Sequence, residues 1–574
     1  MMGLDRRSVL IGSVSAVSIA ALGLAGLWTG NFTSFAVEPI PRDDSFPKLP
    51  IGMNLAGIAD WDTGFPFKNL FLGARPWLTR NLSGRGAHDT NMQAAFQYDD
   101  NGYPLQVPVA APGAAESQTV FTYVPNVRKA GRYVLLYDGE GEIDGLAATK
   151  VISRKPGRLI LQMTHGKLYE AVVIKRSKLG NHVRNIRLVA AEHEASNLAD
   201  DPFLPEFLDF CRPFHALRFM DWAGTNNSTE EHWKDRKRPS FYTMVAVAGD
   251  PEATWGPAPT TFQLKFSGGV AIELMIQLSN MLKIDPWFCI PHRATDDYIA
   301  QFARLVREKL DPGLKVYVEY SNEIWNWSFY QAGWMLRSPL AGVLVEAKGG
   351  KAWKDSAKTK GEGHPERIGA LFRRNFAIWE REWSDDAQNR LIRVGAVQAA
   401  WFDASKRTIQ WCLDYGGLDA VSPTAYIGPN DEIYAKWAEQ GASLTPEQVI
   451  EDLQSELASR RQNYPGAQII AFGRARGLKY VSYESGQHIQ PKGQKDLPYN
   501  GALAAAQSHP RMYNLYLELL RFHRDLGCQM FGHFSSVGQQ GTRWGSWGAK
   551  ARYDTPDAES PKMRALLECN IARG

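Results

Sequence analysis

Short apolar runs alternate with longer amphipathic segments along most of the chain. The first run covers about residues 51–55 and follows a proline-rich stretch. The later runs lie at 215–222, 286–292, 315–325, 391–402, 419–426, 479–488 and 528–536. Near-continuous apolar runs of this length are typical of buried strands in a parallel sheet that is covered on its outer face. The pattern therefore predicts eight parallel strands.

The segments between these runs predict helices. In the clearest one, residues 296–310, one face carries Ile299, Phe302, Ala303, Val306 and Leu310. Asp296 and Asp297 are expected to cap its start, and Pro312 is expected to stop it. Eight alternating strands and helices predict an α/β fold, a (β/α)8 TIM barrel, because a doubly wound open sheet would not gather all eight strand ends in one place.

Residues 98–195 have a different texture, with closely spaced strand-like runs separated by Gly, Asn and Lys turns. This spacing predicts an inserted β-sandwich domain. The rest of the barrel is expected at 37–97 and 196–574. The sandwich is expected to pack against the barrel, rather than to bind carbohydrate, because the sequence alone identifies no paired exposed aromatic residues in it.

Residues 1–36 are predicted to be an export signal or an N-terminal anchor. Arg6 and Arg7 precede about twenty mostly apolar, small residues, and this layout resembles a twin-arginine signal. The small residues at 34–36 offer a cleavage site. An uncleaved segment would be long enough to anchor the chain in a membrane. The expected location is therefore the bacterial periplasm or the medium, or the inner membrane by anchoring.

Composition narrows the function without identifying it. The 574 residues include 65 Lys and Arg against 61 Asp and Glu, a net charge of +4, which does not suggest a nucleic-acid partner. The 18 tryptophans suit either sugar stacking or a large core. Five scattered cysteines without C-x-x-C spacing indicate neither a disulfide framework nor a zinc site, although one isolated disulfide is compatible with them.

Polar and aromatic residues capable of chemistry cluster at the ends of the predicted strands. They are Arg218, Asp221, His292, Asn322, Glu323, Gln398, Trp401, Tyr426, Glu484, His488 and His533. In a (β/α)8 barrel the carboxyl ends of all strands converge on one mouth, so these residues are predicted to share one pocket.

Two of these residues have the chemistry needed to cleave a glycosidic bond, which requires a pair of carboxyl groups. Glu323 lies in the run VYVEYSNEIWNW, and Glu484 lies in VSYESG. Trp325 and Trp327, just beyond Glu323, are candidates for a sugar-stacking platform. Glu319 is expected deeper in the barrel as a supporting partner at most.

Asn-Glu at the end of the fourth strand and Glu at the end of the seventh resemble the motifs of clan A glycoside hydrolases. This resemblance implies that Glu323 is the acid/base and Glu484 the nucleophile. It extends to Arg218 and Tyr426, which would orient the ionised nucleophile, and to Asn322 and His292, which would line the sugar site. No subfamily is identified.

Several features depart from that resemblance or leave its details open. About 65 residues separate Glu323 from the next strand, and their Lys-rich part, residues 348–367, is expected to be a mobile exposed loop that covers the cleft. The inserted sandwich is not a general clan feature. Trp401 is a further candidate for substrate binding, and Trp544 and Trp547 suit either a substrate wall or a packing role.

Together these observations predict a retaining β-glycoside hydrolase that acts by double displacement on a β-linked polysaccharide or oligosaccharide. Given the export signal, a cell-envelope polysaccharide or an exopolysaccharide is the expected substrate. No cofactor and no metal are expected. The alternatives are a noncatalytic carbohydrate-binding protein on the same fold and a transglycosylase. The sequence distinguishes neither endo from exo action nor one oligomeric state from another.

Overall fold

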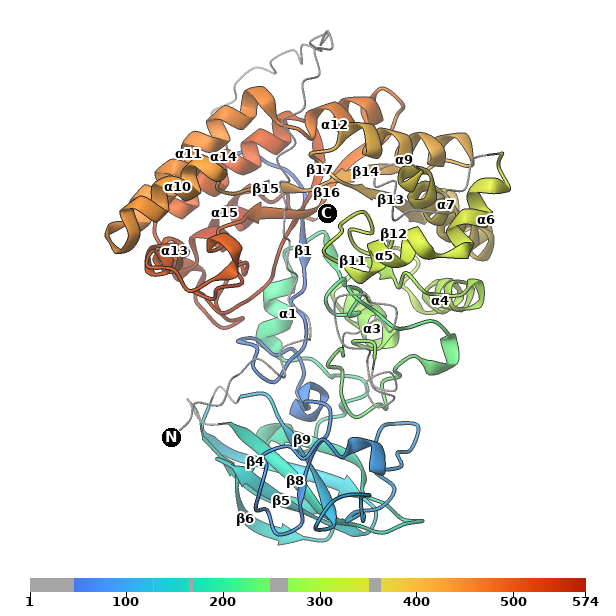
Figure 1. Cartoon of the computed structure of the whole chain (residues 1–574), viewed down its shortest axis with the longest axis vertical. Helices are drawn as coiled ribbons and strands as arrows, with labels where there is room; N and C mark the ends of the chain where they lie inside the picture. Colours follow the sequence, from blue (N-terminus) through green and yellow to red (C-terminus); the bar gives the residue numbers. More distant parts are fainter. Residues whose placement is uncertain (1–45, 127–128, 165–168, 248–266, 350–362, 574) are drawn as a thin grey trace.

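The computed structural model describes residues 46–126, 129–164, 169–247, 267–349 and 363–573. The predicted export signal and most of the Lys-rich segment lie outside these residues. The described chain forms a barrel surrounded by helices and a smaller β domain on one side of it (Figure 1).

The barrel consists of parallel strands that follow the predicted apolar runs. They are β1 (Ile51–Asn54), β10 (Ala216–Arg218), β11 (Asp285–Ile290), β12 (Val316–Tyr320), β13 (Leu391–Val397), β14 (Ala420–Pro423), β15 (Ala425–Ile427), β16 (Lys479–Gln487) and β17 (Cys528–His533). The sixth position of the barrel is divided between β14 and β15, and both pair with β16. Pairing of β1 with both β10 and β17 closes the sheet. The predicted barrel is confirmed.

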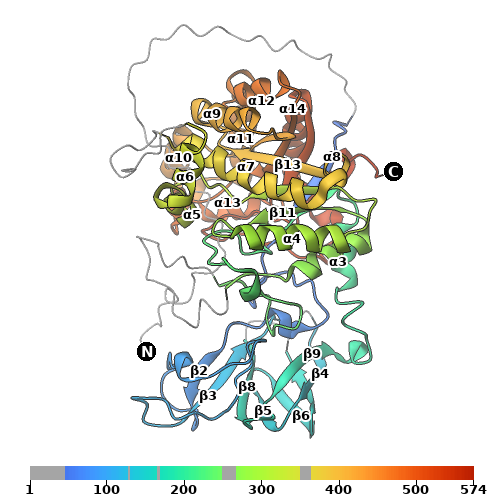
Figure 2. The same cartoon turned by 90° about the vertical axis from the view of Figure 1, so that its right-hand side faces the viewer.

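Helices surround the strands, as Figures 1 and 2 show. They are α1 (Pro205–Cys211), α3 (Ile272–Leu282), α4 (Asp296–Lys309), α5 (Tyr330–Arg337), α6 (Pro339–Glu346), α7 (His364–Trp383), α8 (Ala387–Arg390), α9 (Phe402–Asp414), α10 (Asp431–Gln440), α11 (Pro446–Asn463), α12 (Ala467–Arg474), α13 (Asn500–Ala506), α14 (Arg511–Asp525) and α15 (Pro561–Cys569). The predicted cap of α4 was wrong by one residue. Thr295 caps the helix by accepting a hydrogen bond from the backbone N–H of Tyr298, while Asp296 and Asp297 occupy the first turn, where the helix dipole favours negative charge.

Much of the long connection between β12 and β13 is helical. Helices α5 and α6 precede the segment outside the described residues, and α7 follows it. The described part of the predicted loop therefore includes the start of α7. Residues 350–362, which were expected to cover the cleft, lie outside the described residues.

The β domain consists of two four-stranded antiparallel sheets, with strand orders β2-β3-β8-β5 and β6-β7-β4-β9. The strands are β2 (Leu78–Asn81), β3 (Gln118–Tyr123), β4 (Gly131–Asp138), β5 (Gly141–Ala147), β6 (Lys150–Lys155), β7 (Arg158–Met163), β8 (Glu170–Ser177) and β9 (Arg184–Ala190). The sequence pattern did not indicate β2, β5 or β6. All three strands lie at the edges of their sheets and carry polar or exposed residues, which weakens the apolar alternation that marks a strand.

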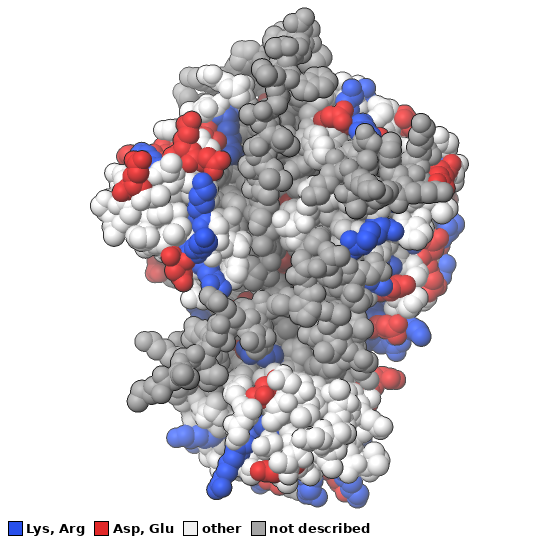
Figure 3. All heavy atoms as spheres, viewed as in Figure 1, with Lys and Arg blue, Asp and Glu red and all other residues white. Residues whose placement is uncertain are grey.

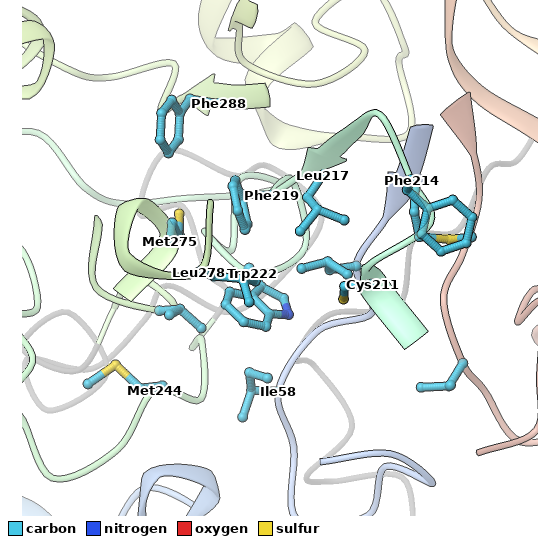
Figure 4. Packing of buried hydrophobic residues seen from close by; sticks show 14 of the residues in the cluster. Ile58, Cys211, Phe214, Leu217, Phe219, Trp222, Met244, Met275, Leu278 and Phe288 are labelled. Carbon is cyan, nitrogen blue, oxygen red and sulfur yellow. The ribbon is translucent and has the colours of Figure 1, made fainter. Parts of the chain in front are cut away.

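One continuous hydrophobic core joins the β domain to the layer between the barrel strands and their helices. Figure 4 shows its central part, where Trp222 lies among residues of β10, α1 and α3 and near Ile58. The ring of Trp222 also contacts Phe67 at 5.8 Å, on the segment that leads into the β domain. A separate apolar cluster fills the inside of the barrel beneath the mouth. All five cysteines lie within the described chain, and each is buried and free.

Candidate active site

Arg218 is the centre of a buried hydrogen-bond network at the carboxyl ends of the strands. It is the last residue of β10, and only 2% of its surface is exposed. Its guanidinium donates to Glu319 Oε1 and Oε2 at 2.9 Å, to Glu484 Oε1 at 2.9 Å, to Asn322 Oδ1 at 2.8 Å and to Asn54 Oδ1 at 2.9 Å. One cation thus connects residues from β1, β10, β12 and β16, so the predicted convergence of strand ends is present here.

Glu319 lies beneath this network and is completely buried. Its two oxygens accept the paired N–H groups of Arg218, and Oε2 also accepts a hydrogen bond from the indole of Trp287 at 2.8 Å. Such a two-point contact fixes the plane of a guanidinium. Glu319 therefore determines which way the remaining N–H groups of Arg218 point, and its predicted supporting position is confirmed.

Glu484 is bound through both of its carboxyl oxygens. Oε1 accepts from Arg218, and Oε2 accepts from the hydroxyl of Tyr426 at 3.0 Å. Burial raises the pKa of Glu484, while the charge and hydrogen bonds of Arg218 and the hydroxyl of Tyr426 oppose that rise. These contacts favour the carboxylate over the acid and hold it in one orientation.

Glu323 has different neighbours. The hydroxyl of Tyr483 donates to Oε1 at 2.7 Å, and the side-chain amide of Asn326 donates to Oε2 at 2.7 Å. Burial, followed by the nearby charge of Glu484, raises the pKa of Glu323 to about 8. Both Glu323 and Ser321 have positive φ angles, 39° and 61°, a backbone conformation that is costly for residues other than glycine and recurs at functional sites.

The electrostatic balance of the mouth favours protonation of Glu323. Arg218 carries one positive charge, and Glu319 and Glu484 both contact it directly. Ionisation of Glu323 would add a further negative charge without a cation of its own. Two glutamates in one pocket are therefore biased toward opposite protonation states, which is the condition for an acid and a nucleophile to coexist.

Tyr483 was missed by the sequence analysis for a specific reason. Successive side chains on a regular strand point to opposite faces, so Tyr483 and Glu484 should not both face the barrel interior. The register between β16 and β17 shifts between Ser482 and Ser485. This irregularity allows both side chains to reach the mouth, and no residue pattern in the sequence marks its position.

Asn326 was also missed, although its signal was present. It lies three residues beyond Glu323, and its backbone N–H donates to the carbonyl of Glu323 at 2.7 Å, which closes a turn. A polar residue at this spacing after a candidate acid can reach back to its carboxyl group. Asn322 also has an asparagine as its partner: its side-chain amide donates to Asn226 Oδ1 at 3.1 Å.

The tryptophans beyond the eighth strand pack beside this network. The ring of Trp547 lies 5.7 Å from Tyr426 and 4.6 Å from His488. Its indole N–H donates to the carbonyl of Trp544 at 3.1 Å. Trp325 is partly buried against the apolar cluster inside the barrel. Trp547 therefore contacts a residue that orients Glu484, whereas Trp544 supports Trp547 through its backbone.

Trp327 and Trp401 form a second aromatic group. They are 38% and 39% exposed, and both flank the ring of His364, at 5.5 and 5.1 Å. Trp327 follows β12 and Trp401 follows β13, so the structure brings two of the predicted stacking residues together. His364, the first residue of α7, was not predicted to take part.

Two of the three predicted histidines at strand ends, His292 and His533, have different environments. His292 lies just beyond β11, and its ring packs edge-on against Trp334 at 5.3 Å. His533 was expected at the mouth, but this was wrong: its ring is within 3.0 Å of the hydroxyl of Tyr516 on α14, in the layer between strand and helix. His533 is on β17, where a single strand position decides which face a side chain takes.

In the ranges that the structure describes, no group of three or more His, Cys, Asp or Glu residues is arranged to hold a metal ion. None of the described helices is long and apolar enough to cross a membrane. On the face shown in Figure 3, basic and acidic residues of the described chain are interspersed over the barrel and the β domain.

No protein-family model matches the chain, and no curated protein matches it. Among solved structures, a β-glycosidase from the hyperthermophile Thermosphaera aggregans aligns with a TM-score of 0.28 and 10% identity, over 65% of this chain and 85% of that chain. A likeness of this size carries no argument about activity. The strand pairing and the geometry of the mouth are therefore the basis for a functional assignment.

Proposed function

We propose that this chain is a retaining β-glycoside hydrolase, with Glu484 as nucleophile and Glu323 as acid/base. The observation that carries the proposal is the contrast between two buried glutamates at one mouth. Glu484 contacts a cation and a tyrosine hydroxyl, whereas Glu323 contacts only neutral donors. Retaining glycosidases require one carboxylate and one carboxylic acid placed on either side of the scissile bond.

In the first step, a carboxylate oxygen of Glu484 attacks the anomeric carbon. The bond from that carbon to the leaving oxygen breaks, and Glu323 transfers its proton to the leaving oxygen. A covalent glycosyl ester on Glu484 and an ionised Glu323 result. Arg218 and Tyr426 keep Glu484 ionised and oriented until the attack.

In the second step, Glu323 accepts a proton from a water molecule, and the water oxygen attacks the anomeric carbon. The ester bond to Glu484 breaks, so that the product keeps its original configuration. The hydrogen bonds from Tyr483 and Asn326 favour the ionised form of Glu323 that this step needs. Water would enter from the side that the leaving group has left.

The remaining predicted residues are proposed to bind sugar. Asn322 lies beside Glu323 and would hydrogen-bond the 2-hydroxyl group, a contact that strengthens in the transition state. Trp547 would stack on a sugar next to Glu484, and Trp327 with Trp401 would stack on sugars farther out. We further propose that the chain is exported, which would make an envelope or extracellular polysaccharide its substrate.

The test is the variant Glu484→Gln, assayed with the parent on β-glucans, β-mannans and bacterial envelope polysaccharides. The parent should release sugars with retained anomeric configuration, as followed by NMR of the first products. Glu484→Gln should lose at least about 10³-fold in rate, since it lacks the nucleophile. The exposed Glu439→Gln on α10 is the matched control and should keep full activity.

Other outcomes would replace the proposal with one of its alternatives. A parent that binds glycans without cleaving any of them would be a carbohydrate-binding protein on the same fold. Products longer than the starting glycan would show that an acceptor sugar replaces water, which is transglycosylation. Inverted products would remove the nucleophilic role of Glu484.

A further inference from the structure

The outer face of one sheet of the β domain carries a group of aromatic side chains, of which His88 and Tyr169 are exposed and Tyr123 is half-buried. Tyr123 is at the end of β3, and its ring lies 5.2 Å from that of Tyr169, which is 55% exposed. On the same side, the ring of His88 stacks on Tyr123 at 5.7 Å, with only 8° between the planes. These rings come from three separate segments of the chain, so the fold assembles them.

This group lies outside the main core. Beneath it is a small apolar cluster of Leu78, Phe121 and Val173, against which Tyr123 is packed. Phe121 and Tyr123 are two residues apart on β3 and therefore share one face of the sheet. The continuous core of the molecule includes neither His88 nor Tyr169. Packing of the domain interior therefore does not account for these exposed rings.

Arg75 extends the group toward the barrel. Its guanidinium lies 4.8 Å from the centre of the Tyr123 ring and 5.2 Å from that of Trp61. It also donates two hydrogen bonds to the carboxylate of Asp60, at 2.9 and 2.8 Å. Trp61 is 42% exposed. The carboxylate of Asp60 is almost fully buried, and the ion pair fixes the plane of the partly exposed guanidinium beside the flat faces of the two rings.

Trp61 belongs to a loop that begins at the barrel mouth. It lies on the connection that follows β1, whose last residue, Asn54, accepts a hydrogen bond from Arg218. Burial and the charge of Asp60 raise the pKa of the neighbouring Asp62, and the charge of Asp221, which follows β10, adds to that rise. The residues therefore run from the loop that follows the first barrel strand onto the sheet β2-β3-β8-β5.

We propose that Trp61, Arg75, His88, Tyr123 and Tyr169 form a second glycan-binding surface, which holds a part of the polysaccharide chain away from the cleavage site. Aromatic faces that alternate with fixed hydrogen-bonding groups match a sugar chain, whose rings have apolar faces and hydroxyl edges. A stable protein partner would cover roughly 800 Å² and about 20–30 residues of this surface, which is far more than this group of side chains offers. The proposal of this surface depends on the proposed function only for the identity of the glycan.

The surface also has a consequence for chain length. A long glycan would contact both the mouth and this surface, and the second contact would occur at high effective concentration. A short oligosaccharide that fills only the mouth would gain nothing from it. The two ligand lengths therefore separate the contribution of the surface from that of the cleavage site.

The experiment compares Tyr169→Ala, Trp61→Ala and the double variant with the parent, by affinity electrophoresis in gels containing β-glucan, β-mannan or envelope polysaccharide. Each single variant is expected to bind the polymer that retards the parent about three- to tenfold more weakly than the parent does. The double variant is expected to bind that polymer at least tenfold more weakly. Leu179→Ala, which removes a 61% exposed apolar side chain from the same domain, should leave binding unchanged. Circular dichroism would verify that all variants are folded.

Hydrolysis assays on the same proteins separate the two proposals. Loss of polymer hydrolysis with unchanged hydrolysis of short oligosaccharides would support the surface. Equal polymer binding by parent and double variant would overturn the surface and leave the function of the mouth intact. Polymer binding that depends on Trp61 and Tyr169 in a protein without hydrolytic activity would support the surface and overturn the proposed function. Failure of the parent to bind any polymer in the panel would overturn the surface.

Discussion

The barrel mouth and the aromatic surface of the β domain differ in burial and in the kind of contact that their side chains make. At the mouth, charged groups are almost entirely buried and each carboxyl oxygen of Glu323 and Glu484 has a named donor. On the β domain, His88 and Tyr169 are exposed, Tyr123 is half-buried, and the contacts are ring stacking together with a hydrogen bond between His88 and the hydroxyl of Tyr123. Burial makes each polar contact at the mouth strong and costly to remove, whereas exposed stacking contacts are weak individually. Substitutions in the two regions should therefore differ in size and in kind.

The largest effect is expected for Arg218→Met. This change removes every hydrogen bond from the guanidinium and leaves Glu319 and Glu484 buried without their cation. We expect activity to fall by more than about 10³-fold and the free energy of unfolding to fall by about 3–5 kcal/mol. Denaturant unfolding and the initial rate on the best polysaccharide measure both.

The control for that change is Arg158→Met in the β domain. Arg158 makes an equally direct two-point contact with Glu194, but both side chains are about one-third exposed. Solvent screening should limit the cost to at most about 1 kcal/mol. Equal destabilisation by the two substitutions would contradict the contrast between buried and exposed contacts.

The second prediction concerns Glu323 and needs no substrate. Because burial raises the pKa of Glu323 to about 8, the folded protein holds a proton that the unfolded chain releases near its ordinary value. The contribution of protonated Glu323 to the free energy of unfolding is fully present at low pH and is lost as the pH rises toward 8. Glu323→Gln removes this dependence, so its free energy of unfolding should exceed that of the parent by about 3–4 kcal/mol more at pH 8 than at pH 5.

Unfolding in denaturant at pH 5, 6, 7 and 8 would measure this difference. Glu439→Gln should show no such trend, since Glu439 is exposed. A constant gap between Glu323→Gln and the parent at every pH would mean that Glu323 is already ionised at pH 5. In that case Glu323 would not be a suitable acid for the first step.

A smaller effect is expected for Tyr483→Phe. The hydroxyl of Tyr483 donates to Glu323 and lowers its pKa, so its removal should raise that pKa further. The upper limb of kcat/KM against pH should move up by about half a unit to one unit, because Glu323 would stay protonated to higher pH. The rate of the second step should fall, since it needs ionised Glu323.

Tyr480→Phe offers a matched comparison for that profile. Tyr480 is a buried tyrosine on the same strand, but its hydroxyl is paired with His523 at 2.8 Å. The two variants lose the same atom, and the pH profile of Tyr480→Phe should keep its position. Identical profiles for Tyr483→Phe and the parent would remove Tyr483 from the machinery around Glu323.

The extent of what could be predicted follows the same division. Strand ends with carboxylates indicated Glu323 and Glu484, because a closed barrel brings residues about 160 positions apart into one mouth. Tyr483 could not be predicted, since it depends on the irregular register of β16. The pairing of Tyr123 with Tyr169 could not be predicted either, because antiparallel neighbours become adjacent only when the sheet order is known.

The smallest effect is expected for Tyr169→Ala on stability. Its ring is more than half exposed and contacts chiefly another ring at the surface, so its removal should change the free energy of unfolding by no more than about 0.5 kcal/mol. Leu135→Ala, in the fully buried interior of the same domain, should cost about 2–5 kcal/mol. If Tyr169→Ala were as destabilising as Leu135→Ala, the ring would be a packing element, and its exposure would no longer argue for a ligand. A neutral effect on folding together with weaker binding of long glycans would instead show that the ring is maintained for contact with a partner outside the chain.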